Sequence, residues 1–191
     1  MTSIVFPGQG SQTTGMVKDF YDNFKIAELI FEEIEDYTKI DLKKIIFDNT
    51  DNRLDLTQFT QISIFAASFT IFNIYCYETN YNNEETNVMM GHSLGEYTAL
   101  ACSNKISLKD CSLILKKRGE LMNNAVPPNE TGMAALIGKE SDLIQNIIDK
   151  NNLKLEIAND NSNIQIVISG NINELKKSEE IFINNGIKKF V

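Results

Sequence analysis

The chain has 191 residues, of which 42% are hydrophobic and 23% charged, a composition typical of a globular protein. Its net charge of −8 argues against nucleic-acid binding, which requires a basic surface facing phosphate. No run approaches the roughly 18 apolar residues of a membrane span, and the N-terminus lacks the basic start and apolar core of a signal peptide. We therefore expect a cytoplasmic protein, or less readily one of a bacterial-type organelle, with neither a nucleic-acid nor a membrane partner.

The three cysteines are irregularly spaced, at Cys76, Cys102 and Cys111, without a CxxC pair. An odd number of scattered cysteines is typical of reduced thiols that behave as small buried hydrophobes. Because the chain contains one histidine, the three or four ligands of a zinc site are not available, and we expect no metal.

The first predicted elements alternate between strand and helix. A short apolar run at residues 3–6 predicts a buried strand, followed by a Pro-Gly-Gln-Gly loop. Apolar residues at helical spacing predict one helix over 16–38, and 41–49 resembles a second, shorter helix. The apolar segment 56–80 is too long for a strand, so it predicts a buried helix with Thr57 as a candidate N-cap.

Further along, the pattern predicts a short strand at 88–90, a helix at 93–104 and a helix at 107–126 with Ser107 as its N-cap. From Gly132 onward the expected elements are strand, helix, strand, strand, helix and strand, at 132–138, 140–150, 153–159, 164–170, 171–186 and 187–191, with a turn at 160–163 between the third and fourth. Gly186 would end the second of these helices. This βαββαβ order is the ferredoxin-like motif. We therefore divide the chain into a first domain at 1–128 and a small ferredoxin-like subdomain at 129–191.

The sequence Gly-His-Ser-Leu-Gly at 91–95 lies between a predicted strand and a predicted helix. A GxSxG turn in this position is a nucleophile elbow, which exposes a serine at the start of a helix. Ser93 is thus the candidate nucleophile, and the backbone N–H of Leu94 is a candidate oxyanion donor. The alternative is a turn serine that only caps the helix.

A serine nucleophile normally requires a general base within hydrogen-bond reach. The single histidine, His92, is adjacent to Ser93, and adjacent residues of such a turn project in different directions. We therefore expect His92 to have a packing or turn-stabilising role and not to be the base.

Four ordered motifs carry a resemblance: "FPGQGSQ", Thr60–Gln61, "GHSLGEY" and "RGELM". Together they resemble the malonyl-CoA:acyl carrier protein transacylases and the acyltransferase domains of fatty acid and polyketide synthases. The resemblance implies an α/β fold, with part of an α/β-hydrolase-like large domain built on a parallel sheet, beside the ferredoxin-like subdomain. It also implies that malonyl-CoA acylates Ser93 and that the pantetheine thiol of acyl carrier protein removes the malonyl group, with no further cofactor.

The same resemblance implies roles for other residues. The N–H of Gln9 would be the second oxyanion donor, and Arg118 would pair with the malonyl carboxylate, which a guanidinium can bind through two hydrogen bonds. Polar positions near the substrate correspond to Gln61, Asn159 and Asn161. The alternatives are a plain loop residue for Gln9 and, for Arg118, a solvated basic face shared with Lys116 and Lys117. The chain departs from the family pattern where proline is common, at Ile62 and Asn163.

The family's catalytic histidine follows the strand that begins at 187, and this chain stops at Val191. The resemblance therefore implies about two-thirds of a family member, without the catalytic base. It could be a fragment, the product of a truncated or split gene, or one of two polypeptides. We expect this chain alone to be nearly inactive, since a positioned general base contributes about 10²–10⁴-fold.

Two other functions compete with the transacylase. A GxSxG serine hydrolase would not account for the Pro-Gly-Gln-Gly loop, Arg118 or the ferredoxin-like unit. A degenerate, non-catalytic relative that binds acyl carrier protein or CoA would account for the missing base. Of the two pathways we expect fatty acid synthesis, because the chain begins directly at its first strand.

Overall fold

A computed structural model describes residues 2–81, 86–126 and 130–191. The chain divides into two compact units, residues 1–125 and residues 126–191. The domain boundary that we predict after residue 128 falls in 127–129, outside the described residues, so it stays a prediction.

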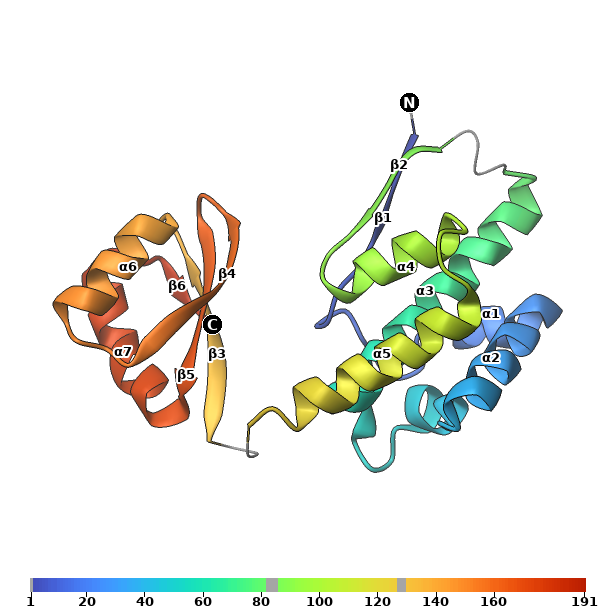
Figure 1. The fold of residues 1–191 in the computed structure, drawn as a ribbon, viewed down its shortest axis with the longest axis horizontal. Helices are drawn as coiled ribbons and strands as arrows, with labels where there is room; N and C mark the ends of the chain where they lie inside the picture. Colours follow the sequence, from blue (N-terminus) through green and yellow to red (C-terminus); the bar gives the residue numbers. More distant parts are fainter. Residues whose placement is uncertain (1, 82–85, 127–129) are drawn as a thin grey trace. The chain divides into compact units, whose positions relative to one another are not determined.

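The first unit contains two parallel strands whose ends define the position of the candidate site. Strand β1 (Thr2–Phe6) pairs with β2 (Thr86–Gly91), with Phe6 opposite Gly91 (Figure 1). Because the strands run in the same direction, the loop after β1 and the turn after β2 emerge at the same edge of the sheet.

The other regular elements of the described first unit are helical: α1 (Lys18–Asn23), α2 (Lys25–Thr38), α3 (Thr57–Thr79), α4 (Leu94–Cys102) and α5 (Leu108–Asn123), with a π-helical turn at Lys44–Asp48 and a 3₁₀ turn at Arg53–Asp55. The single helix predicted over 16–38 is wrong, because Phe24 is extended (φ −127°, ψ 116°) and separates α1 from α2. The Phe24 ring stacks on Phe20, with centroids 6.1 Å apart, and an extended residue interrupts the helical bond pattern.

Helix α3 is the central helix of the first unit. Among the described residues it is the one helix long and apolar enough to cross a membrane, contrary to our expectation that no segment approaches that length. Its residues 60–67 are all buried, however, which is typical of a core helix. Thr57 is not the N-cap: Leu56 occupies that position, and Thr57 is the first helical residue.

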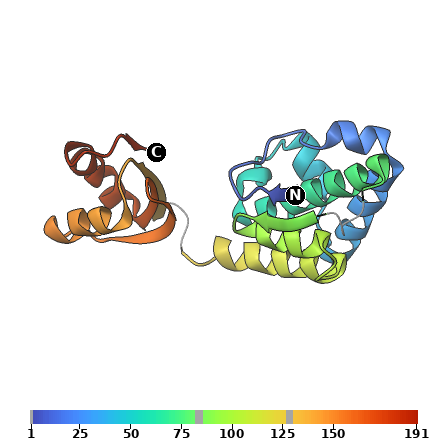
Figure 2. The same cartoon turned by 90° about the horizontal axis from the view of Figure 1, so that it is seen from above.

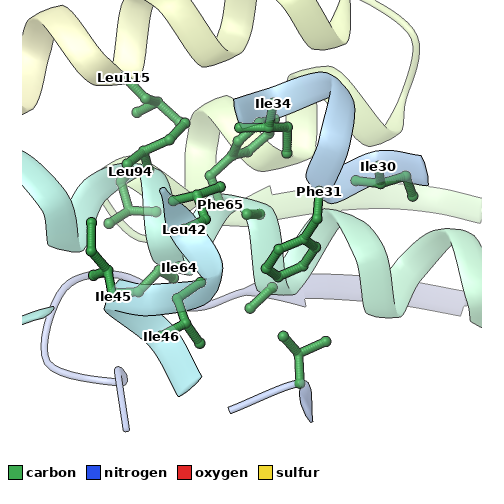
Figure 3. Close-up of a cluster of buried hydrophobic side chains, with 14 of the residues drawn as sticks. Ile30, Phe31, Ile34, Leu42, Ile45, Ile46, Ile64, Phe65, Leu94 and Leu115 are labelled. Carbon is green, nitrogen blue, oxygen red and sulfur yellow. The ribbon is translucent and has the colours of Figure 1, made fainter. Parts of the chain in front are cut away.

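A buried apolar cluster joins the helices beneath the nucleophile turn. Leu94, the residue after Ser93, is fully buried and packs in this cluster with Ile64 and Phe65 of α3 and Leu115 of α5 (Figure 3). The Leu94 side chain, next to Ser93 in the sequence, thus packs the start of α4 against α3 and α5.

The second unit confirms the βαββαβ order: β3 (Thr131–Ile137), α6 (Ser141–Lys150), β4 (Leu155–Ser162), β5 (Gln165–Asn171), α7 (Ile172–Asn184) and β6 (Lys189–Phe190). Its described strands are ordered β4-β5-β3-β6, and each neighbouring pair is antiparallel. Figures 1 and 2 show α6 and α7 on one face of this sheet. The predicted turn at 160–163 is too long, since β4 extends to Ser162 and the chain turns at Asn163 and Ile164.

Candidate active site

Ser93 lies on a strained turn between β2 and α4. Its φ of 56° and ψ of −107° fall in a region that residues with a side chain rarely adopt, which is typical of functional sites. Backbone hydrogen bonds hold the turn: the His92 N–H donates to Phe6 O at 3.2 Å, and the Gly95 N–H donates to His92 O at 3.0 Å. The predicted nucleophile elbow is confirmed.

The two glycines of the GxSxG motif are required by close backbone approaches. A Cβ on Gly91 would lie 2.0 Å from the carbonyl carbon of Gly95. A Cβ on Gly95 would lie 2.4 Å from Phe6 O. Neither position can hold a side chain unless the backbone moves, so the spacing of the motif follows from the packing of α4 on β1 and β2.

The loop after β1 touches this elbow, as the parallel strands predict. A Cβ on Gly8 would lie 2.6 Å from His92 O. In the described part of the chain, neither the Gln9 N–H nor the Leu94 N–H donates to another group. The Leu94 N–H belongs to the first turn of α4, where a helix has unpaired donors and a positive dipole end. Both amides are therefore available to an incoming oxyanion.

A chain of side-chain hydrogen bonds connects Ser93 to the loop. Arg118 Nη2 donates to Ser93 Oγ at 2.8 Å, and Arg118 Nη1 donates to Gln61 Oε1. Gln61 Nε2 donates to Gln9 Oε1 at 3.0 Å, and Gln9 Nε2 donates to Thr57 Oγ1 at 3.3 Å. The structure thus brings together four of the candidate residues from four separate segments of the chain. Gln61, at the middle of this relay, is only 1% exposed.

Arg118 is the member of its basic run that faces the serine. Lys116 Nζ donates to Thr38 O at 2.9 Å, and Lys117 Nζ lies 4.0 Å from Glu120. The Arg118 guanidinium instead lies over the Tyr97 ring, 5.8 Å from its centroid. Arg118 is therefore not part of a solvated basic face shared with Lys116 and Lys117.

Sequence reasoning missed two residues of this site, Thr57 and Tyr97. Tyr97 is four residues after Ser93 on a predicted helix, a spacing that places both on one face, so that signal was present. No sequence pattern placed Thr57 in the site. In the structure its hydroxyl accepts a hydrogen bond from Gln9 and does not cap the helix.

His92 is exposed, and within the described residues its ring forms no hydrogen bond with Ser93 Oγ. Asn159 and Asn161 lie on β4, which belongs to the second unit and not to the unit that contains Ser93. Their proximity to Ser93 stays a prediction.

The thiols lie outside the relay. Burial raises the pKa of Cys111 to about 12 and raises the pKa of Cys102 further, so both stay protonated at neutral pH. Cys76 is half-buried. In the ranges that the structure covers, His, Cys, Asp and Glu form no group of three that could hold a metal.

Comparisons with known proteins agree on one family. Residues 4–187 match the acyl transferase domain. A malonyl CoA-acyl carrier protein transacylase of Bacillus subtilis is 35% identical over 193 residues, which cover 99% of this chain and 59% of the relative. An acyl-carrier-protein S-malonyltransferase from Bartonella henselae has a similar structure, with a TM-score of 0.90, 35% identity, and coverage of 100% of this chain and 62% of its own.

A second similar structure is a type II polyketide synthase acyl carrier protein in complex with its malonyl-transacylase. The match has a TM-score of 0.87 and 31% identity, and it covers 99% of this chain and 61% of that one. This chain therefore spans about 60% of the length of the proteins that it matches.

Proposed function

The chain belongs to the acyl transferase domain family, and from this premise we propose that it carries the nucleophile and the carboxylate-binding part of a malonyl-CoA:acyl carrier protein transacylase. In the first half-reaction, Ser93 Oγ attacks the thioester carbonyl of malonyl-CoA. The C–S bond then breaks, CoA leaves as the thiol, and the malonyl group remains as an ester on Ser93. In the second half-reaction, the pantetheine thiol of acyl carrier protein attacks this ester and regenerates the Ser93 hydroxyl.

The tetrahedral intermediate of each half-reaction carries a negative oxygen. The N–H groups of Leu94 and Gln9 are the donors that we propose for it, because one lies at the start of α4 and the other in the loop that touches the elbow. Preorganised donors of this kind are usually the largest contribution to acyl-transfer catalysis.

Arg118 supports the malonyl assignment more than any other residue. Its Nη2 lies 2.8 Å from Ser93 Oγ, so an acyl group attached to that oxygen would extend next to the guanidinium. A partly buried guanidinium prefers a carboxylate, and an acetyl group would leave it without a counter-charge. This contact is the observation that carries the proposal.

The reaction also requires a proton acceptor for Ser93, and we propose that it lies outside these 191 residues. The exposed His92, whose ring does not bond Ser93 Oγ among the described residues, supports this assignment. The 41% of the Bacillus subtilis relative that this chain does not span is where we expect such a base. We further propose a cytoplasmic reaction with no cofactor beyond the two substrates, the thioester malonyl-CoA and the pantetheine thiol of acyl carrier protein.

Radiolabelled malonyl-CoA tests the proposal. We expect slow, stoichiometric labelling of the purified chain, about 10²–10⁴-fold slower than that of the full-length Bacillus subtilis relative. Ser93→Ala should abolish the label, whereas Ser103→Ala, at a half-buried serine of the same unit whose hydroxyl donates to Leu100 O, should not change it. Labelling as fast as that of the relative would show that the base lies within this chain.

The acyl acceptor separates this function from its competitors. A labelled chain that transfers malonate to acyl carrier protein faster than to water is a transacylase, and one that prefers water is a hydrolase. A chain that binds CoA or carrier protein without ever forming the ester is a non-catalytic relative. Comparing a fatty acid carrier with a polyketide carrier tests the pathway, for which we propose fatty acid synthesis.

A further inference from the structure

Arg118 is held by contacts of three different kinds. One edge of the guanidinium donates to Gln61 and another to Ser93, while its face lies over the Tyr97 ring. Two of the contacts are directional hydrogen bonds, and the third is a cation–π contact that depends on the plane of the ring.

The position of Tyr97 relative to α5 is itself fixed. Cys111 Sγ lies 3.5 Å from the backbone oxygen of Tyr97 and donates to it. Cys111 and Arg118 are seven residues apart on α5, so they lie on the same face of that helix. The α5 face that carries Arg118 therefore packs on α4 at Tyr97, which places the ring beside the guanidinium.

A carboxylate that approaches Arg118 from the side of Ser93 can replace the serine hydroxyl as the acceptor of Nη2. Both bonds are partly buried, but Gln61 itself is buried and bonds onward to Gln9, whereas Ser93 is half-buried and offers a neutral hydroxyl. Exchange at Nη2, from Ser93 Oγ to a carboxylate oxygen, gains a charge-assisted bond and also releases the nucleophile. During that exchange one of the two directional bonds is broken.

We propose that Tyr97 is a positioning residue for Arg118, because its ring face fixes the guanidinium plane while Nη2 passes from Ser93 to the substrate carboxylate. The inference rests on the proposed function, in which Arg118 binds the malonyl carboxylate. The ring and not the phenolic hydroxyl makes the contact, so Tyr97→Phe retains the function and Tyr97→Leu loses it.

The chain suits a direct measurement, because Arg53 and Arg118 are its two arginines. An ¹⁵N NMR spectrum of the arginine Nε–Hε groups therefore contains two side-chain signals. Arg53 provides an internal reference: it lies over the Phe59 ring at 5.4 Å and pairs with Asp51 at 2.7 Å. Titration with free malonate should move the Arg118 signal and leave the Arg53 signal unchanged.

The variants then separate ring from hydroxyl. We expect wild type and Tyr97→Phe to bind malonate with Kd values within about twofold of each other, and Tyr97→Leu to bind it about three- to tenfold more weakly. Phe59→Leu is the matched control, since it removes the ring beneath the other arginine and should leave the malonate affinity unchanged. If Tyr97→Leu loses its folded amide spectrum, Tyr97→Met replaces it with the same expected loss, because methionine fills irregular packing.

Three results would overturn the inference. Equal malonate affinity of wild type and the folded leucine or methionine variant would remove the positioning role while leaving the carboxylate role of Arg118 intact. A loss in Tyr97→Phe as large as in Tyr97→Leu would show that the hydroxyl and not the ring matters. A wild-type Arg118 signal that malonate does not move would remove both the inference and the proposed function on which it rests.

Discussion

Gly95→Ala tests whether the close approach of α4 to β1 holds the nucleophile in place. A Cβ at this position would lie 2.4 Å from Phe6 O and 2.8 Å from Pro7 O, both of which are backbone atoms. Relieving the shorter contact to about 3.5 Å requires a separation of about 1 Å between the helix and the strand. Overpacking of this kind costs about 1–3 kcal/mol and occasionally more, and the better helix propensity of alanine offsets about 1 kcal/mol.

We therefore expect Gly95→Ala to lower the free energy of unfolding of the first unit by about 1 kcal/mol. Because the displaced segment carries Ser93, single-turnover malonylation should slow by about 100-fold, the cost of a misplacement of about 1 Å. Gly132→Ala is the control, since its Cβ would meet only side-chain atoms, Leu175 Cδ1 at 3.1 Å and Ile172 Cγ1 at 3.9 Å, and a flexible side chain can move aside.

Urea denaturation followed by amide NMR reports on each unit separately, and radiolabelled malonyl-CoA reports the rate. If Gly95→Ala matches wild type within about 0.5 kcal/mol and labels at the same rate, the elbow does not depend on this contact, and the packing account of the GxSxG motif is wrong.

Two further predictions concern the relay and the thiols. Gln61→Leu removes the acceptor of Arg118 Nη1 and the donor to Gln9; malonate affinity, read from the Arg118 signal, should fall about tenfold, and an unchanged Kd would show that the relay does not position the guanidinium. For Cys111, burial raises the pKa from 9.0 to about 12, so the unfolded chain loses this proton at a lower pH than the folded chain does. The stability that this pKa difference contributes is complete below pH 9 and is lost as the pH rises toward 12, by up to about 1.4 kcal/mol per pH unit. Urea titrations of wild type and Cys111→Ala should therefore diverge in that pH range. Parallel curves would contradict the assignment.

The parts of this site that the sequence predicted are those with local causes. The Gly91–Gly95 turn was predictable because a strand, a tight turn and a helix follow one another within a few residues. The proximity of the Gly8 loop to the turn was implied by the resemblance, which pairs Gln9 with Leu94, and the parallel order of β1 and β2 accounts for it. In both cases the backbone alone determines the geometry.

The remaining features depend on packing between distant segments. No local pattern indicated that Gln61 and Arg118 meet, so these residues were identified by resemblance to a family. No glycine or proline in this segment indicates the helix break at Phe24. The Phe24 ring instead stacks on Phe20. Thr57 was misassigned because a threonine near a helix start suits a cap as well as a first helical position that faces a neighbouring loop.

The relay from Arg118 to Thr57 has a direction, and that direction explains why position 61 requires an amide. Gln61 accepts from the guanidinium with its oxygen and donates to Gln9 with its nitrogen, so it is neutral toward the cation and still anchors the loop. Deamidation to glutamate would abolish that donor and would give Arg118 a permanent counter-ion from its own protein. Such a molecule would fold with the guanidinium that we propose binds malonate already neutralised. Aged preparations that have deamidated at this residue should then fail to respond to malonate while their amide spectra remain native.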